Sequence, residues 1–196
     1  TEQLELCQKS LTAFLDTKRA QFPRFYFVSD PTLLEILSLG SDPPSVTPHF
    51  QSVLFDSLTA VTFDTQAKTK LTAMFSQQTE CVKFVKENDG VLDPAPVMAV
   101  GNIESWLQAL VEGMQESIRS TIKMANEAVF EKELEEFIFG FPAQIALLGI
   151  QVLWTNDMQT ALTGAKQDKS KMVKALKKQE TPLKETIGIT TRPDLD

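Results

Sequence analysis

The sequence predicts a mostly α-helical fold, an elongated array of helix pairs with a small antiparallel β-sheet inserted between two helical parts. Three observations support this fold class. Apolar residues recur at three- and four-residue steps over long stretches near both ends of the chain. Between about residues 60 and 84 the apolar period changes to two. If each helix pair packs only on its neighbours, as in a solenoid, the array is elongated.

The first predicted part, residues 1–58, is helical around one aromatic segment. Residues 3–20 carry the apolar stripe of a packed helix, formed by Leu4, Cys7, Leu11, Phe14, Leu15 and Lys18. Pro23 ends this helix, because a proline pushes the preceding residue out of the α region. Residues 22–27 are predicted to be an extended core segment, with Phe25 and Phe27 on one face of the small sheet and Tyr26 on the other.

The same part continues with two further helices. Asp30 is the expected N-cap, Pro31 the first helical residue and Gly40 the C′ residue of one helix. A second helix is expected to start near residues 44–48 and to bury Phe50, Val53, Leu54 and Leu58.

The second predicted part, residues 59–100, is a small sheet and a connector. The alternating pairs are Val61/Phe63, Leu71/Ala73/Phe75 and Val82/Phe84, with turns at residues 76–79 and 86–90. Residues 91–100 contain Pro94 and Pro96 and form an extended connector that cannot be helical. This connector and the adjoining sheet are expected to be the most weakly packed segment of the chain.

The third predicted part, residues 101–196, is helical. Asn102 caps a helix from Ile103 to about Phe137, whose near-heptad seam is Leu107, Val111, Met114, Ile118, Ile122, Ala125 and Val129. Residues 137–142 turn the chain into a helix over 143–162, and the two form an αα-hairpin that moves as one body. The segment 166–178 is a lysine-rich helix packed through Met172, Val173 and Leu176, and residues 181–196 are weakly determined.

Composition and charge restrict the function classes. A net charge of −7 argues against a dedicated nucleic-acid binder. Cys7 and Cys81 lack CxxC spacing, which favours reduced thiols in a cytosolic protein. There is no signal peptide and no apolar run of about 18 residues, so no membrane partner is predicted. The chain starts at Thr1 within a helical pattern and ends in a polar tail, which indicates a segment of a longer protein.

No catalytic, cofactor-binding or metal-binding residue is predicted. Gly164-Ala165-Lys166 lacks the preceding glycine and the following Ser or Thr of a phosphate-binding loop. His49 with Asp42 or Asp56 has no nucleophile in a recognisable motif, so a half-buried or surface histidine is favoured.

Three further groups of residues each allow a functional and a structural interpretation. The carboxylates Glu131, Glu133, Glu135 and Glu136 are a cation site or a solvated helix face, and the face is favoured. The lysines of 166–178 bind an acidic surface or only balance the acidic remainder of the chain, and the second is favoured. Trp106 and Trp154 are groove anchors or core residues, and core is favoured.

Residues 21–38 read QFPRFYFVSDPTLLEILS, which resembles the linker region of dynein heavy chains. Further motifs follow in the same order as in that family. Residues 72–82 lie where the family has an M-S-x-E-G-E-x-V hairpin, with Gln77-Gln78-Thr79 in place of its Glu-Gly turn. Residues 100–107 are similar to a VE-x-WL helix start, and residues 141–162 to a (Y/F)PAQ…QI-x-WT…AL stretch. Pro193 interrupts the helix of the family near Thr190-Thr191-Arg192. The WT…AL and TT-R-x-DL motifs are more similar to axonemal than to cytoplasmic dynein heavy chains.

The resemblance implies a mechanical role. The linker arches over a ring of AAA modules and converts its ATP-driven conformational change into microtubule-based movement. It also implies a segment that is not itself an enzyme and holds no cofactor, with ATP and magnesium bound in the ring of the parent chain. The implied partners are that ring, the dynein tail and its associated chains, with microtubules reached only through the parent motor. The implied location is the cytoskeleton of a ciliary or flagellar axoneme. Two alternatives remain. One is a static helical scaffold that docks other subunits. The other is a small α-helical enzyme, for which the sequence offers no nucleophile, metal set or cofactor loop.

Overall fold

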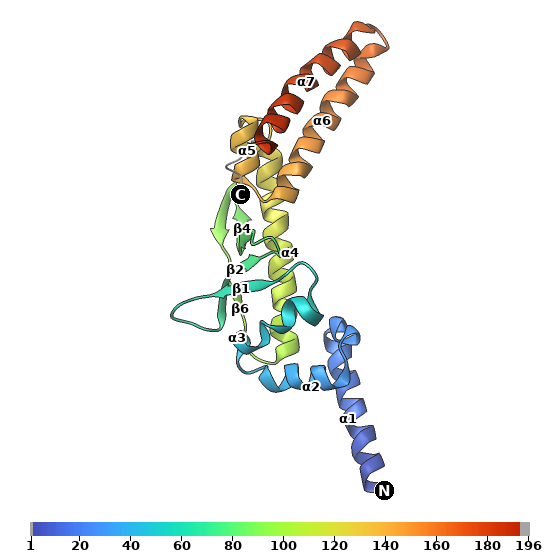
Figure 1. Ribbon diagram of the computed structural model, residues 1–196, viewed down its shortest axis with the longest axis vertical. Helices are drawn as coiled ribbons and strands as arrows, with labels where there is room; N and C mark the ends of the chain where they lie inside the picture. The colour runs from blue at the N-terminus through green and yellow to red at the C-terminus, as the bar shows by residue number, and fades with distance from the viewer. Residues whose placement is uncertain (1, 193–196) are drawn as a thin grey trace. The chain divides into compact units, whose positions relative to one another are not determined.

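A computed structural model describes residues 2–192 (Figure 1). It confirms a mostly α-helical chain with a small antiparallel sheet. The chain forms two compact units, residues 1–118 and 119–196, and the boundary falls inside helix α4 (Ile103–Ala128). The three-part division at residues 58 and 100 stays a prediction. Within the described range, no helix is both long enough and apolar enough to cross a bilayer.

The first unit begins with five helical elements. They are α1 (Glu2–Gln21), the 3₁₀-helix η1 (Pro23–Phe27), α2 (Asp30–Leu39), α3 (Pro43–Val46) and the π-helical turn η2 (Phe50–Leu54). Only the C-terminal part of α1 packs, since Leu15 is its one buried side chain and the other predicted stripe residues Leu4, Leu11 and Phe14 are exposed.

The aromatic segment is the main correction in this part of the chain. It is not a strand of the sheet but the 3₁₀-helix η1, with Phe25 fully buried and Phe27 86% exposed. A 3₁₀-helix has three residues per turn, so every third residue shares a face. Phe22, Phe25 and Val28 are accordingly the buried residues, and the rings of Phe22 and Phe25 meet edge to face at 5.0 Å.

The helix boundaries that follow also differ from the prediction. Ser29, not Asp30, is the N-cap of α2. Gly40 has a right-handed φ of −60° and is not a left-handed C′ residue. A Cβ on Gly40 would lie 2.9 Å from Ile103 Cβ, so the glycine serves the close approach of α4. Residues 44–58 form α3 and η2 instead of one helix, although Phe50, Leu54 and Leu58 are buried as predicted.

The predicted sheet is present and is organised around β2 (Lys70–Phe75). Strands β1 (Ala60–Phe63), β3 (Cys81–Lys83) and β6 (Val97–Met98) all pair with it in antiparallel register. A separate hairpin joins β4 (Val85–Asn88) and β5 (Val91–Pro94). The connector at 91–100 is extended as predicted, but it is not weakly packed, because β6 pairs with β2 and Val97 and Ala99 are buried.

One apolar core joins α1, η1, α2, the sheet and the N-terminal part of α4. Its members run in sequence from Leu15 to Leu110 and include the buried Trp106. Glu104 is also buried in this unit, where Lys18 of α1 forms an ion pair with it. The core and this ion pair hold α1 and α4 together through interactions that are distant in sequence.

The second unit contains the end of α4 with α5 (Leu134–Gly140), α6 (Ala143–Ala165) and α7 (Ser170–Thr190). The predicted helix 103–137 is broken at residues 129–133, and α6 pairs with α7 instead of forming a hairpin with that helix. A Cβ on Gly149 of α6 would meet Phe137 at 2.5 Å and Val129 at 3.6 Å. In one unbroken helix those two residues would lie about 12 Å apart along the axis. The break brings both against the same glycine.

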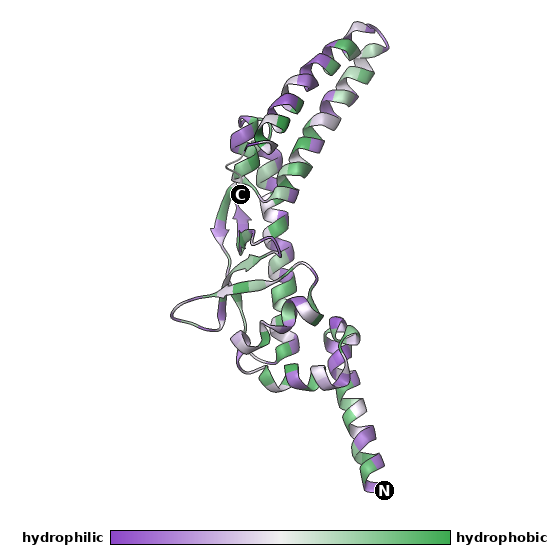
Figure 2. Ribbon diagram, viewed as in Figure 1, coloured by the Kyte–Doolittle hydropathy of each residue, from purple (hydrophilic) through white to green (hydrophobic). Residues whose placement is uncertain are grey.

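Helix α7 starts later and runs further than predicted. It begins at Ser170 and continues through Pro182 to Thr190, so residues 181–190 are ordered as helix. Its buried residues are Ala175 and Ile189, and Val173 and Leu176 are exposed instead of packed. Figure 2 shows more hydrophilic residues along α7 than along α6. The prediction about Pro193 concerns residues outside the described range.

Candidate functional site on helices α5, α6 and α7

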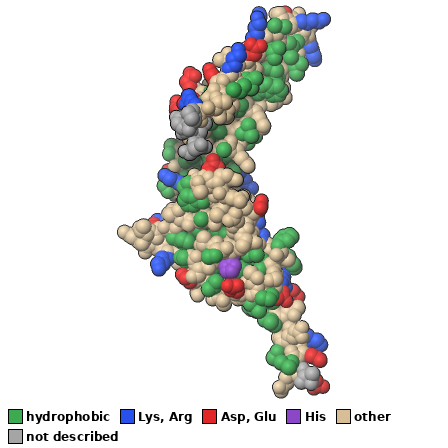
Figure 3. Space-filling model, in the orientation of Figure 1, with side chains coloured by type: hydrophobic (Ala, Val, Ile, Leu, Met, Phe, Trp, Pro, Cys, Tyr) green, Lys and Arg blue, Asp and Glu red, His purple; other side chains and the backbone are tan. Residues whose placement is uncertain are grey.

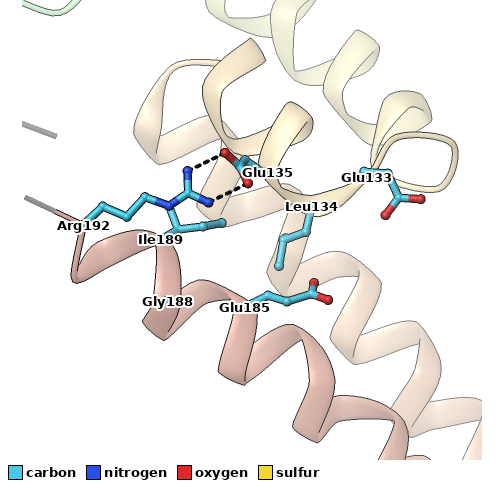
Figure 4. A pocket seen from close by; sticks show the side chains of 7 residues that line it. All are labelled: Glu133, Leu134, Glu135, Glu185, Gly188, Ile189 and Arg192. Atoms are coloured by element: carbon cyan, nitrogen blue, oxygen red, sulfur yellow. Dashed lines mark hydrogen bonds and ion pairs between the residues drawn. The ribbon is translucent and has the colours of Figure 1, made fainter. Parts of the chain in front are cut away.

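A cavity of about 460 Å³ opens between α5 and the C-terminal end of α7 (Figure 4). Its lining residues are Glu133, Leu134, Glu135, Glu185, Gly188, Ile189 and Arg192. Three of them are glutamates and one is an arginine. This cavity is therefore acidic overall and unsuited to phosphate groups, which are bound by helix N-termini and cationic side chains.

The polar contact across this cavity is a bidentate ion pair. Arg192 Nη1 donates to Glu135 Oε1 at 2.6 Å, and Nη2 donates to Oε2 at 2.9 Å. Hydrogen bonds from the Arg192 guanidinium hold the pKa of the Glu135 carboxyl below its usual value. The two residues are 57 positions apart, so the pair joins the start of α5 to the second residue after α7. Both side chains are about half exposed, so the pair is accessible to salt and water.

A smaller cavity of about 130 Å³ lies between α5, α6 and α7. It is mainly apolar, and its members include Phe137, Ile150, Leu153 and Trp154. At its polar end, Asp157 accepts hydrogen bonds from Lys178 Nζ at 2.9 Å and Gln179 Nε2 at 2.8 Å. These contacts fix the pairing of α6 with α7.

The structure places the other candidate residues of the sequence analysis in different environments. Trp106 is core, as favoured, whereas Trp154 is half exposed and lines the small cavity. His49 is half buried, with Nε2 3.9 Å from Glu35 Oε1. Lys166 is the C-cap of α6, at the helix end whose dipole disfavours phosphate.

The acidic run of residues 131–136 forms a turn and the start of α5. Its four glutamates are exposed, and two of them pair with cations, Glu135 with Arg192 and Glu136 with Lys132. No group of three or more potential metal ligands is assembled within residues 2–192.

Among the cavity-lining residues named above, only Trp154, Glu133 and Glu135 were functional candidates from the sequence. Glu185 lies in no motif considered in the sequence. Arg192 and Asp157 lie within motif stretches, but their partners Glu135 and Lys178 are 57 and 21 residues away, and no motif pairs them. Only the packing of α7 on α5 and α6 brings them together.

Comparison with known proteins identifies the family. Residues 1–125 match the family model "Dynein heavy chain, N-terminal region 2". The dynein gamma chain of the flagellar outer arm of Chlamydomonas reinhardtii is 54% identical over 194 residues, which is 99% of this chain and 4% of that protein. The mouse dynein axonemal heavy chain 5 is 42% identical over 193 residues, which is 97% of this chain and 4% of that protein. The ciliary dynein beta chain of Tripneustes gratilla is 36% identical over 191 residues, covering 95% of this chain and 4% of its own.

The chain belongs to the dynein heavy chain family. This confirms the resemblance predicted from the sequence motifs. The names of the relatives are axonemal, flagellar or ciliary, in agreement with the predicted axonemal type and location. The chain spans about 4% of the length of these relatives.

Proposed function

We propose that this chain is a mechanical segment of the linker of an axonemal dynein heavy chain. It transmits the ATP-driven conformational change of the AAA ring into microtubule-based movement. Membership of the N-terminal region 2 family is the observation that carries the proposal. The single apolar core of the first unit supports it in physical terms.

That core makes the first unit suitable for transmitting displacement. Side chains from Leu15 of α1 to Leu110 of α4 pack in one cluster. Protein interiors are close-packed and of low compressibility, so a displacement applied at one side of such a cluster reaches the other. The Lys18–Glu104 ion pair adds a direct connection between α1 and α4. Residues 15–110 are therefore proposed to move as one body, including the connector at 91–100.

The segment is proposed to act without binding nucleotide itself. Lys166 stands at the C-terminal end of α6, and the larger cavity of the second unit carries three glutamates. Both features oppose phosphate binding, since helix C-termini and carboxylates repel anions. ATP and magnesium are assigned to the AAA ring of the parent chain, and no catalytic residue or cofactor to this segment.

The proposed partners follow from the same role. They are the AAA ring of the same heavy chain, the dynein tail and its associated chains. Microtubules are reached only through the parent motor, and neither nucleic acid nor a membrane is a proposed partner. The proposed place of action is the ciliary or flagellar axoneme, consistent with the names of the relatives.

Distance measurements in the parent motor distinguish a mechanical linker from a static scaffold. One label pair joins Thr17 of α1 to Gln77 of the β2–β3 turn, both exposed residues within the proposed body of residues 15–110. A second pair joins Gln77 to a site on the ring. The proposal expects the first distance to stay constant between nucleotide-free and nucleotide-bound motors, and the second to change. Constancy of both distances would favour the scaffold, and a change in the first would contradict the single-body transmission.

A further inference from the structure

Helix α7 carries two seams of mainly apolar residues. The first faces the other helices of its unit and consists of half-buried or buried residues, namely Met172, Ala175, Gln179, Pro182, Thr186 and Ile189. The second lies one residue further along at each step and consists of Val173, Leu176, Glu180, Leu183 and Ile187. One residue turns a helix by about 100°, so the second seam is a separate face of α7.

This outer seam has the spacing of a coiled-coil interface but is uncovered. Its residues follow alternating steps of three and four, the a and d positions of a heptad repeat. Its four apolar side chains are between 53% and 64% exposed: Val173, Leu176, Leu183 and Ile187. Figure 3 shows hydrophobic atoms gathered over the α6–α7 hairpin, with lysines at its margins.

The charges beside the outer seam are basic. Lys177 and Lys184 directly follow Leu176 and Leu183, in the e positions that flank a heptad seam. Both are exposed, and neither forms an ion pair with a residue in the described range, whereas Lys178 is bound to Asp157. Charges in e positions select partners of opposite sign.

We propose that the outer seam of α7 docks an acidic amphipathic helix, a partner surface that is independent of the linker role. The partner helix packs apolar a and d residues against Val173, Leu176, Leu183 and Ile187, and its flanking carboxylates meet Lys177 and Lys184. Glu180 is the polar residue at one a position, where a single polar side chain sets register and partner choice. A narrow seam interrupted by a carboxylate favours a helix over a membrane surface, which binds a wider apolar face.

Two synthetic peptides of about four heptads test the proposal against the whole chain. Both have leucine at a and d, one with glutamate and the other with lysine at e and g. Fluorescence anisotropy should show saturable binding of the glutamate peptide, at least about tenfold tighter than that of the lysine peptide and weakened by salt. Replacing Glu180→Leu should tighten binding of the glutamate peptide, because it removes the one charge from the seam.

The double variant Leu176→Glu/Leu183→Glu should lose this binding by at least about tenfold. Both positions are exposed, so its thermal melt should remain that of the unchanged chain, and Leu11→Glu on α1 is the matched control that should bind normally. Equal affinity for the two peptides, or full binding by the double variant, would overturn the proposal. Binding to anionic phosphatidylserine vesicles without binding to the glutamate peptide would overturn it in favour of a membrane surface.

Discussion

Gly113 of α4 lies directly against Val97 of β6. A Cβ built on Gly113 would stand 2.3 Å from Val97 Cγ2, closer than real Cβ contacts come. Helix α4 therefore packs on the sheet through a glycine, and the connector that the sequence marked as weakly packed is held at this point.

We predict that Gly113→Ala destabilises the first unit by about 1–2 kcal/mol. Overpacking against the stiff Val97 side chain costs about 1–3 kcal/mol, and the better helix propensity of alanine offsets up to about 1 kcal/mol. Gly188→Ala in α7 is the matched control, since nothing lies within 4 Å of its Cβ. It should stabilise by up to about 1 kcal/mol. Chemical denaturation of both variants measures the difference, and equal effects would contradict the close contact.

The β2–β3 turn carries a strained residue. Thr79 has a φ of 63°, in the left-handed region that favours glycine. It stands within Gln77-Gln78-Thr79, the residues that replace the Glu-Gly turn of the family.

Replacing Thr79→Gly should stabilise the chain by about 0.5–1 kcal/mol, since relief of strain exceeds the added entropy of the unfolded state. Gln78→Gly, at a position without a positive φ, should destabilise by a similar amount. Thermal melts of the two variants test the sign. A loss of stability in Thr79→Gly would show that the turn is unstrained.

The contrast between two phenylalanines of η1 gives a third prediction. Phe25→Ala should cost about 3–5 kcal/mol, because the ring is fully buried and packs on Phe22. Phe27→Ala should change stability by less than about 0.5 kcal/mol, because Phe27 is 86% exposed. The denaturant midpoints of the two variants, compared with that of the unchanged chain, measure these losses. Similar losses for both would support the strand predicted from the sequence over the 3₁₀-helix.

These residues also show what the sequence could and could not predict. The sheet was predictable because alternation is a local signal, and β1, β2 and β3 lie where Val61, Leu71 and Val82 indicate. The aromatic segment is predicted wrongly because Phe25 and Phe27 alternate with Tyr26 as in a strand. The buried residues Phe22, Phe25 and Val28 instead follow the three-residue period of a 3₁₀-helix.

Long-range packing accounts for the other differences between the sequence-based prediction and the structure. The end of α4 near Ala128 has no proline or glycine to mark it, and it depends on the fit of Val129 and Phe137 to Gly149. The Arg192–Glu135 pair joins residues 57 apart that no local sequence pattern links, so the sequence could not identify the larger cavity.

The Arg192–Glu135 pair predicts a pH dependence. Its hydrogen bonds lower the pKa of Glu135 below the ordinary value of 4.5. A lowered carboxyl pKa in the folded state stabilises the protein above the unfolded-state pKa, and the contribution disappears as the pH falls through the folded-state pKa.

Arg192→Gln should therefore melt at a lower temperature than the unchanged chain at pH 7, with the difference closing toward pH 3. Carboxyl carbon NMR of Glu135 should show its pKa rising in the variant. Lys68→Gln, an exposed loop substitution, is the control and should show no such convergence. A difference in melting temperature that is constant from pH 7 to pH 3 would show that the Arg192–Glu135 pair does not stabilise the folded chain.

The central claim is that the first unit transmits displacement as part of a dynein linker, and microtubule gliding by the parent motor tests it most directly. Phe25→Leu should loosen the core that joins α1 to α4 without unfolding it. We expect gliding velocity to fall while the ATPase rate is retained, with Phe27→Ala leaving both unchanged. Unchanged gliding in Phe25→Leu, or a loss of gliding and ATPase in equal proportion, would contradict the claim.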